Sequence, residues 1–212
     1  MKKTKIQKIE DLAGLLPKQS YSLSGLPMEP INLVVIGNRR FLYKHFKTHG
    51  WFRADKLGAL SLTKALVTGA LSLSYHEGPI SGSYINKKRF AIGFEHPTKS
   101  DTFRRRHHLR LWRTPYKLMG RRVWAGTLSF DRSAGLSKTY LPTHHISPSL
   151  SWEEDFLAKS LGVSRPKHLK LSPAYKGKLN TGDDYEYDGR ALVLDLSGLA
   201  GLAGSGHGGG KS

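Results

Sequence analysis

The chain has 212 residues and contains no cysteine. The absence of thiols excludes disulfides, cysteine nucleophiles and cysteine-ligated zinc. Histidine, aspartate and glutamate are therefore the side chains left to bind a transition metal. A chain of this length can bury a sizeable core without covalent staples, so we expect a single domain.

Long apolar runs are also absent. The longest apolar stretch, residues 57–75, is interrupted by Lys64 and by glycines, serines and threonines. A membrane-spanning helix needs about 20 predominantly apolar residues, so we predict none. The basic start of the chain resembles an export signal, but Glu10 and Asp11 stand where its apolar run would have to lie. We expect no signal peptide, and a location in the cytoplasm or peripheral to the inner membrane.

Acidic residues are scarce. The chain has 34 Lys and Arg against 16 Asp and Glu, which gives a formal net charge of +18 at pH 7. Such a surplus favours partners that carry phosphate, whether nucleic acid, anionic lipid or a small phosphorylated ligand. Nucleic acid is the less expected of these, because Phe94, Trp112, Trp124 and Phe130 lie in alternating segments typical of a core and leave no stacking platform.

Composition divides the chain into an arm, a domain and a tail. Residues 1–29 are polar and basic with several prolines, and we expect them to form an arm before the fold. Residues 30–196 predict one α/β domain of the α+β kind. It should have a mixed, largely antiparallel sheet and about three helices packed mainly on one face. Residues 197–212 are glycine-rich and predict a disordered tail.

Hydrophobic periodicity locates the elements of this domain. Alternating or β-branched segments predict strands at 31–36, 89–94, 104–113, 122–132, 144–147 and 190–196. Helices are expected at 38–50, at 58–75, and after Ser151, which forms a capping-box pattern with Glu154. Between the two most regular strands, residues 114–120 predict a turn-rich hairpin loop.

Three short motifs suggest phosphate or calcium binding but lack the context that such sites need. Gly37 precedes a helix start, yet no Gly-x-x-Gly follows it. The tail resembles a P-loop, but Ser205 stands where the first glycine belongs and no helix can follow. Residues 184–195 outline a calcium loop, but their second half predicts a strand instead of a helix. We therefore expect an acidic turn before a strand there.

Two doubled histidines are the most distinctive feature of the chain. His107 and His108 lie within Arg104-Arg-Arg-His-His-Leu-Arg-Leu-Trp112, and His144 and His145 lie within residues 143–147. Each pair falls in a segment that alternates like a strand. Neutral imidazole can bind a metal, and arginine can clamp an oxyanion, so the segments suit an anion, a metal or a proton in transit.

Strand register decides which of these side chains share a face, because a slip of one residue reverses the face of every side chain. Only one pairing of residues 104–113 with 122–132 separates apolar from polar side chains. It directs Leu109, Leu111, Trp124, Leu128 and Phe130 toward the core. The other face then carries Arg106, His108, Arg110, Thr127, Ser129 and Asp131. Asp131 can orient an imidazole or pair with a guanidinium group.

Three interpretations of this polar face stay open. In the first interpretation it is a solvated face, where Asp131 forms a surface ion pair that contributes about 0–1 kcal/mol to stability. Alternatively, it binds an anionic, phosphate-bearing ligand through Arg106, His108 and Arg110, together with His144 or His145. In the third interpretation His108, His145 and Asp131 bind a divalent metal ion that activates water.

The polar face also supplies candidates for catalysis. In an enzyme, His108 or His145 would be the general acid or base, Asp131 would orient a histidine, and the arginines would stabilise charge on a phosphoryl or acyl oxygen. His107 and Arg132 border the same segments and are further candidates for ligand contacts. The sequence does not decide between an enzyme and a binding protein.

Several segments together resemble the LssY C-terminal domain family. They include Pro30-Ile-Asn-Leu-Val-Val-Ile-Gly37, the Arg-rich block 104–112, Val123-Trp-Ala-Gly126, Thr143-His-His-Ile146 and Asp188-Gly-Arg190. The resemblance runs from about residue 30 to 196. Such domains often follow membrane-embedded segments of the type 2 phosphatidic-acid phosphatase class. This association implies a phospholipid headgroup or related envelope chemistry as the ligand, but it carries no catalytic mechanism to these residues.

Overall fold

The computed structural model describes residues 4–56, 79–80, 82–98, 105–136, 142–179 and 181–196. Its largest sheet is built from β1 (Thr4–Ile6), β4 (Leu33–Ile36), β5 (Phe52–Arg53), β10 (Ile92–Pro97), β11 (Arg106–Leu118), β12 (Arg121–Leu136), β13 (Pro142–Ile146), β14 (Lys167–Lys170) and β17 (Arg190–Asp195). The strand order is β14-β17-β4-β12-β11-β10-β5, with β1 paired to β11 and β13 paired to β12. Only the β17–β4 and β1–β11 pairings of this sheet are parallel, so the predicted mixed, largely antiparallel sheet is confirmed.

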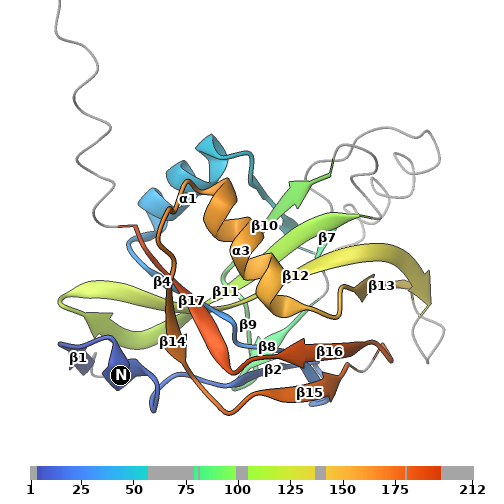
Figure 1. Cartoon of the computed structure of the whole chain (residues 1–212), viewed down its shortest axis with the longest axis horizontal. Helices are drawn as coiled ribbons and strands as arrows, with labels where there is room; N and C mark the ends of the chain where they lie inside the picture. The colour runs from blue at the N-terminus through green and yellow to red at the C-terminus, as the bar shows by residue number, and fades with distance from the viewer. Residues whose placement is uncertain are drawn as a thin grey trace, which may run out of the picture.

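Two helices, α1 (Arg39–Thr48) and α3 (Leu150–Ser160), lie together over one face of this sheet (Figure 1). Leu42 and Phe46 of α1 and Leu157 of α3 pack with apolar side chains of β4, β11 and β12 in one core cluster. The predicted helix at 38–50 is confirmed, and Asn38 caps its start by accepting a hydrogen bond from the backbone N–H of Phe41. The predicted helix at 58–75 lies outside the described residues, which therefore contain two α-helices instead of about three.

Short strands cover the other face of the sheet (Figure 1). They are β2 (Gln19–Tyr21), β3 (Pro27–Pro30), β8 (Tyr84–Ile85) and β9 (Lys88–Arg89) in one sheet, and β15 (Tyr175–Lys178) and β16 (Asp184–Tyr187) in a hairpin. A further parallel pair joins β6 (Asp55–Lys56) and β7 (Pro79–Ile80). The molecule is thus layered, with helices on one face of the large sheet and short strands on the other.

The described part of the expected N-terminal arm, residues 4–29, is built into this covering layer. Strand β1 pairs with β11, a 3-10 helix follows at Glu10–Leu12, and β2 and β3 belong to the small sheet. Ile6, Leu12 and Leu16 are buried in the core beneath them. The expectation of an arm before the fold was wrong for these residues. The lysines and prolines of the segment suggested a polar arm, although Ile6, Ile9, Leu12 and Leu16 recur at intervals of three or four residues.

The β11–β12 hairpin confirms the predicted register and corrects the predicted loop. Arg106 pairs with Asp131, and His108 pairs with Ser129. Strand β11 continues through most of residues 114–120, and the turn is only Met119-Gly120, both with positive φ, as tight two-residue hairpins require. A register irregularity between Arg113 and Lys117 accommodates the proline that had suggested a longer loop.

Two further expectations concern the C-terminal half. The capping box at Ser151 is wrong, because α3 begins at Leu150 and Glu154 is buried instead of reaching back to the cap. Residues 184–195 form β16, a short turn at Asp188-Gly189 and β17. The expected strand is confirmed, but most of the acidic segment before it is the strand β16 and not a turn. The glycine-rich tail, residues 197–212, lies outside the described residues. None of the helices in the described ranges is long and apolar enough to cross a membrane.

Candidate functional site

The three cations of the predicted polar face lie together but are buried. Arg106, His108 and Arg110 are only 2%, 3% and 2% exposed. They project from β11 toward the covering layer of short strands, beside Ser129 and Asp131 of β12. The interpretation as a solvated strand face is therefore wrong.

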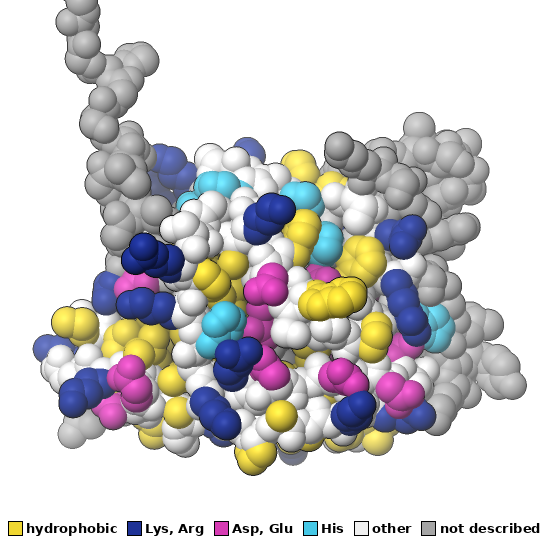
Figure 2. Space-filling model, in the orientation of Figure 1, with side chains coloured by type: hydrophobic (Ala, Val, Ile, Leu, Met, Phe, Trp, Pro, Cys, Tyr) yellow, Lys and Arg dark blue, Asp and Glu magenta, His cyan; other side chains and the backbone are white. Residues whose placement is uncertain are grey.

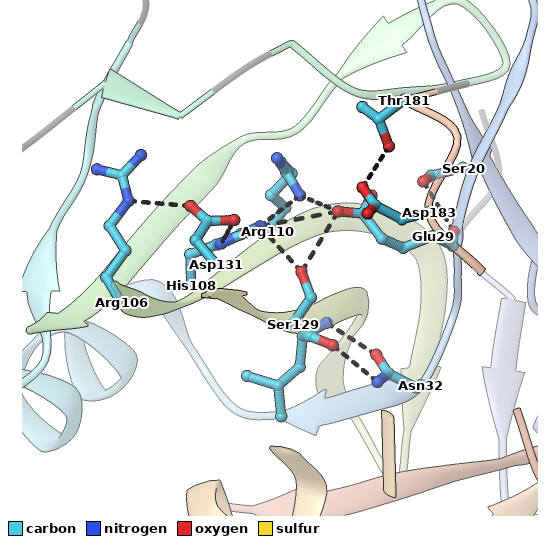
Figure 3. A network of polar contacts seen from close by, with 11 residues as sticks. Ser20, Glu29, Asn32, Arg106, His108, Arg110, Ser129, Asp131, Thr181 and Asp183 are labelled. Atoms are coloured by element: carbon cyan, nitrogen blue, oxygen red, sulfur yellow. Dashed lines mark hydrogen bonds and ion pairs between the residues drawn. The ribbon is translucent and has the colours of Figure 1, made fainter. Parts of the chain in front are cut away.

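Two carboxylates that the sequence analysis missed pair with the arginines. Glu95 lies opposite His108 on β10, and its Oε2 is 2.6 Å from Nη1 of Arg106. Glu29 reaches in from β3, and its Oε1 is 2.8 Å from Nη1 of Arg110. Asp131 completes the set, with Oδ2 3.2 Å from Nε of Arg106. Figure 3 shows Glu29 and Asp131 converging on Arg110 and Arg106. We call these five charged side chains, together with His108, the buried network.

His108 lies at the centre of the buried network. Its Nδ1 is 3.3 Å from Oδ1 of Asp131, and its Nε2 is 3.0 Å from Oγ of Ser129 and 3.7 Å from Oε1 of Glu29. Burial alone would lower the pKa of His108, and the nearby Arg110 also lowers it. The attraction of the Asp131 carboxylate, to which that of Glu29 adds, outweighs these effects, so the pKa of His108 is raised.

The charges of the buried network balance when His108 is protonated. Three cations, Arg106, His108 and Arg110, then face three carboxylates, Glu29, Glu95 and Asp131. Burial would raise the pKa of Glu29, but Arg110 and His108 lower it to about 2. Balance is required because an uncompensated charge in the interior costs several kcal/mol. The guanidinium groups are thus bonded to carboxylates of the chain itself, and their contact with an external ligand stays a prediction.

The three doubled histidines whose side chains the structure describes, His107, His108 and His145, do not share a carboxylate partner. His107 lies on the helix-covered face, where its ring stacks on Phe156 at 3.6 Å and its Nδ1 is 2.7 Å from a Glu153 oxygen. His145 contacts Asp183 through its Nδ1, at 2.9 Å. Each described histidine of the pairs therefore has its own carboxylate partner. The side chain of His144 lies outside the described part of the structure.

No metal site follows from these placements. Within the ranges that the structure describes, no three His, Asp or Glu side chains are grouped so that they could hold a metal ion. This holds for His108, His145 and Asp131, the predicted ligands of a divalent ion.

A cavity lies at the other end of β11, beside the start of α1. Its volume is about 360 Å³, and it is lined by Gly37, Asn38, Phe41, Lys117, Gly120, Arg121 and Arg122. Arg121 forms two hydrogen bonds to Asp195, at 2.9 and 2.8 Å. Lys117 and Arg122 have no ion pair with any described carboxylate. We call this cavity the basic pocket.

Comparison with protein families adds one finding to this geometry. Residues 13–191 match the family described as the LssY C-terminus. The chain belongs to this family. The match confirms the resemblance and begins before residue 30, so the LssY C-terminus region includes β2 and β3, which carries Glu29 of the buried network. No match was found among curated proteins or among solved structures.

The LssY C-terminus domain also buries a carboxyl group in α3. Glu154 is 2% exposed, and burial, with Asp188 adding to the effect, raises its pKa to about 9. Its Oε2 lies 3.3 Å from Nε2 of His168, whose own pKa burial lowers. At neutral pH both groups are therefore uncharged, and their contact is one between neutral partners instead of an ion pair.

This buried carboxyl predicts a loss of stability at alkaline pH. Because its folded pKa is above the unfolded value of 4.5, the stability it contributes is complete below pH 4.5 and is lost as pH rises through about 9. Glu154→Gln should therefore unfold with a free energy higher than wild type by about 1–3 kcal/mol at pH 10. Urea unfolding between pH 6 and 10 measures this. Glu186→Gln, at an exposed position, serves as the control and should follow the wild-type pH dependence.

Proposed function

We propose that this LssY C-terminus domain binds an anionic, phosphate-bearing ligand in the basic pocket. One observation carries the proposal: the residues lining the cavity include three cations, Lys117, Arg121 and Arg122, and no carboxylate. A phosphate group would supply the missing negative charge. Arginine is well suited to this contact because its planar fork of N–H donors matches two phosphate oxygens at once.

The pairing of each cation favours the basic pocket over the buried network as the place of ligand binding. Arg106 and Arg110 are buried against carboxylates, whereas Lys117 and Arg122 are half-exposed and have no described carboxylate partner. A ligand at the buried network would have to displace internal ion pairs. A ligand at the basic pocket would instead relieve repulsion among neighbouring cations, and the net charge of +18 would favour its approach.

The start of α1 adds to the positive potential of the pocket. Gly37, Asn38 and Phe41 line the cavity at the N-terminus of this helix, where backbone N–H groups have no partner within the helix. The Asn38 side chain accepts a hydrogen bond from Phe41, and the N–H groups of residues 39 and 40 are not used by this cap. The helix dipole therefore supports, and does not by itself create, an anion site.

Titration calorimetry with inorganic phosphate at 0.15 M salt tests this function. Arg122→Glu should weaken phosphate binding at least about tenfold, since a charge-assisted contact contributes about 1.5–3 kcal/mol. Arg105→Glu is the matched control, because it makes the same change of charge at an exposed position. Arg105 directly precedes the first residue of β11, at the end of the strand far from the basic pocket. That position is roughly 40 Å away along the strand, well beyond the Debye length of about 8 Å.

The control should change the dissociation constant less than about twofold. Equal losses in both variants would mean that phosphate responds only to total charge, and would refute the basic pocket as the site. The same result, joined to a steep fall of affinity for an unrelated oligonucleotide with salt, would favour non-specific nucleic-acid binding instead.

A further inference from the structure

His145 and Asp183 contact each other outside the buried network. His145 lies on β13, and Asp183 lies in the loop between β15 and β16. Nδ1 of His145 is 2.9 Å from Oδ1 of Asp183. The histidine side chain is 32% exposed, while the aspartate side chain is only 4% exposed. A buried carboxylate therefore holds an imidazole that remains accessible to solvent.

Both oxygens of Asp183 are engaged, which fixes the direction of the carboxylate. Thr181 donates a hydrogen bond to Oδ2 at 2.7 Å. Nη2 of Arg132 lies 3.5 Å from Oδ1, and the arginine side chain is 53% exposed. A guanidinium group that can meet a ligand thus lies beside the carboxylate that orients His145.

The contact also selects one tautomer of the neutral ring. When Nδ1–H donates to Asp183, Nε2 carries no proton and can accept one. Nε2 of His145 has no partner among the described residues. His107 and His108 differ, because the first is stacked against Phe156 and the second is enclosed in the buried network.

We propose that His145 is the general base and acid of a hydrolytic site for anionic phosphate esters. Asp183 is its positioning residue, and Arg132 binds the phosphoryl oxygens. Nε2 of His145 takes a proton from water, and the water oxygen forms a bond to phosphorus. The bond from phosphorus to the leaving oxygen breaks, and the imidazolium returns the proton to that oxygen.

This site is separate from the basic pocket. Arg132 and the pocket residues Arg121 and Arg122 all lie on β12, but ten residues separate Arg122 from Arg132, which is roughly 33 Å along an extended strand. Loss of phosphate binding at the basic pocket would therefore leave the His145 site unaffected, and the two proposals can fail independently.

Hydrolysis of bis(4-nitrophenyl) phosphate and of 4-nitrophenyl phosphate tests the activity. The wild-type chain should release 4-nitrophenolate from at least one of them, and His145→Gln should lower the rate at least about 100-fold. Asp183→Asn should lower kcat and leave KM nearly unchanged, because it removes the carboxylate that orients the imidazole and leaves Arg132 to bind the phosphoryl oxygens. His49→Gln is the matched control. His49 is a half-buried histidine at the C-terminal end of α1, so this variant should keep the wild-type rate.

A second measurement uses only the wild-type chain, so it requires neither turnover nor a folded variant. Nitrogen-15 NMR of the wild-type chain should show neutral His145 protonated at Nδ1. The proposal is overturned by an Nε2-protonated ring, by the absence of hydrolysis of both esters, or by a His145→Gln variant that keeps the wild-type rate. If the His145–Asp183 contact were only structural, Asp183→Asn would change the melting temperature. The chain would then show no rate of ester hydrolysis that depends on His145.

Discussion

Glu29→Leu is expected to lower the free energy of unfolding by about 3–5 kcal/mol. The substitution removes the carboxylate that lies 2.8 Å from Arg110 and 3.7 Å from His108. Both cations would then remain in the interior, away from water, with one negative charge fewer to compensate them. The loss of a single partner is costly because the desolvation of the remaining charge is no longer offset.

A double variant separates this explanation from a simple loss of packing. Glu29→Leu combined with Arg110→Met removes both charges, so the pair should cost clearly less than Glu29→Leu alone. Asp195→Ala breaks the exposed pair with Arg121 and should cost about 0–1 kcal/mol. Urea unfolding at pH 7 measures all three. If Glu29→Leu cost no more than Asp195→Ala, the buried network would not be a set of compensated interior charges.

Asn32→Leu is expected to have the second largest effect, about 2–5 kcal/mol. Asn32 is fully buried, and its side-chain amide acts as an extension of the β4–β12 ladder. Nδ2 donates to the carbonyl oxygen of Leu128 at 2.9 Å, and Oδ1 accepts from the Leu128 N–H at 2.8 Å (Figure 3). Leucine has a similar size but would leave both backbone groups of Leu128 without a partner.

The position matters because Ser129, the next residue of β12, contacts His108 in the buried network. Thermal and urea unfolding of Asn32→Leu measure the loss. Asn38→Ala serves as the comparison, since it removes one exposed cap of α1 and should cost about 1 kcal/mol. A cost for Asn32→Leu no larger than that of the cap variant would mean that water or a shifted strand satisfies Leu128.

The polar face of β11 and β12 was predictable from the sequence because strand side chains alternate with a period of two. Once apolar residues were assigned to the core, Arg106, His108 and Asp131 had to share the other face. Whether that face is solvated was not predictable. Its burial depends on Glu29 and the short strands that cover it, and Glu29 is 81 residues away from Arg110 in the chain.

The carboxylate partners of the doubled histidines could not be predicted either, because they are also distant in the sequence. Alternation places His107 and His108 on opposite faces, but it does not say what each will meet. Glu153 lies 46 residues after His107, and Asp183 lies 38 residues after His145. No local pattern connects such distant residues, so a common pocket was expected where the structure has three separate histidine–carboxylate contacts.

The basic pocket was predictable from the sequence only in part. Lys117, Arg121 and Arg122 lie close together in the sequence, so their concentration of charge is visible there. Proline and glycine within residues 114–120 suggested a loop, and the strand irregularity that accommodates the proline was not apparent. The cavity forms only because β12 pairs with β4, which places the start of α1 beside the hairpin turn.

Figure 2 shows Lys and Arg side chains spread over the visible face of the molecule, so total charge alone does not locate a ligand. A titration with inorganic phosphate, followed through the arginine Nε–H signals in nitrogen-15 NMR, makes the most direct distinction. The signal of Arg122 should shift and saturate, while those of Arg106 and Arg110 stay unchanged because carboxylates of the chain already hold them. Saturable shifts of Arg106 or Arg110 with Arg122 unmoved would contradict this account.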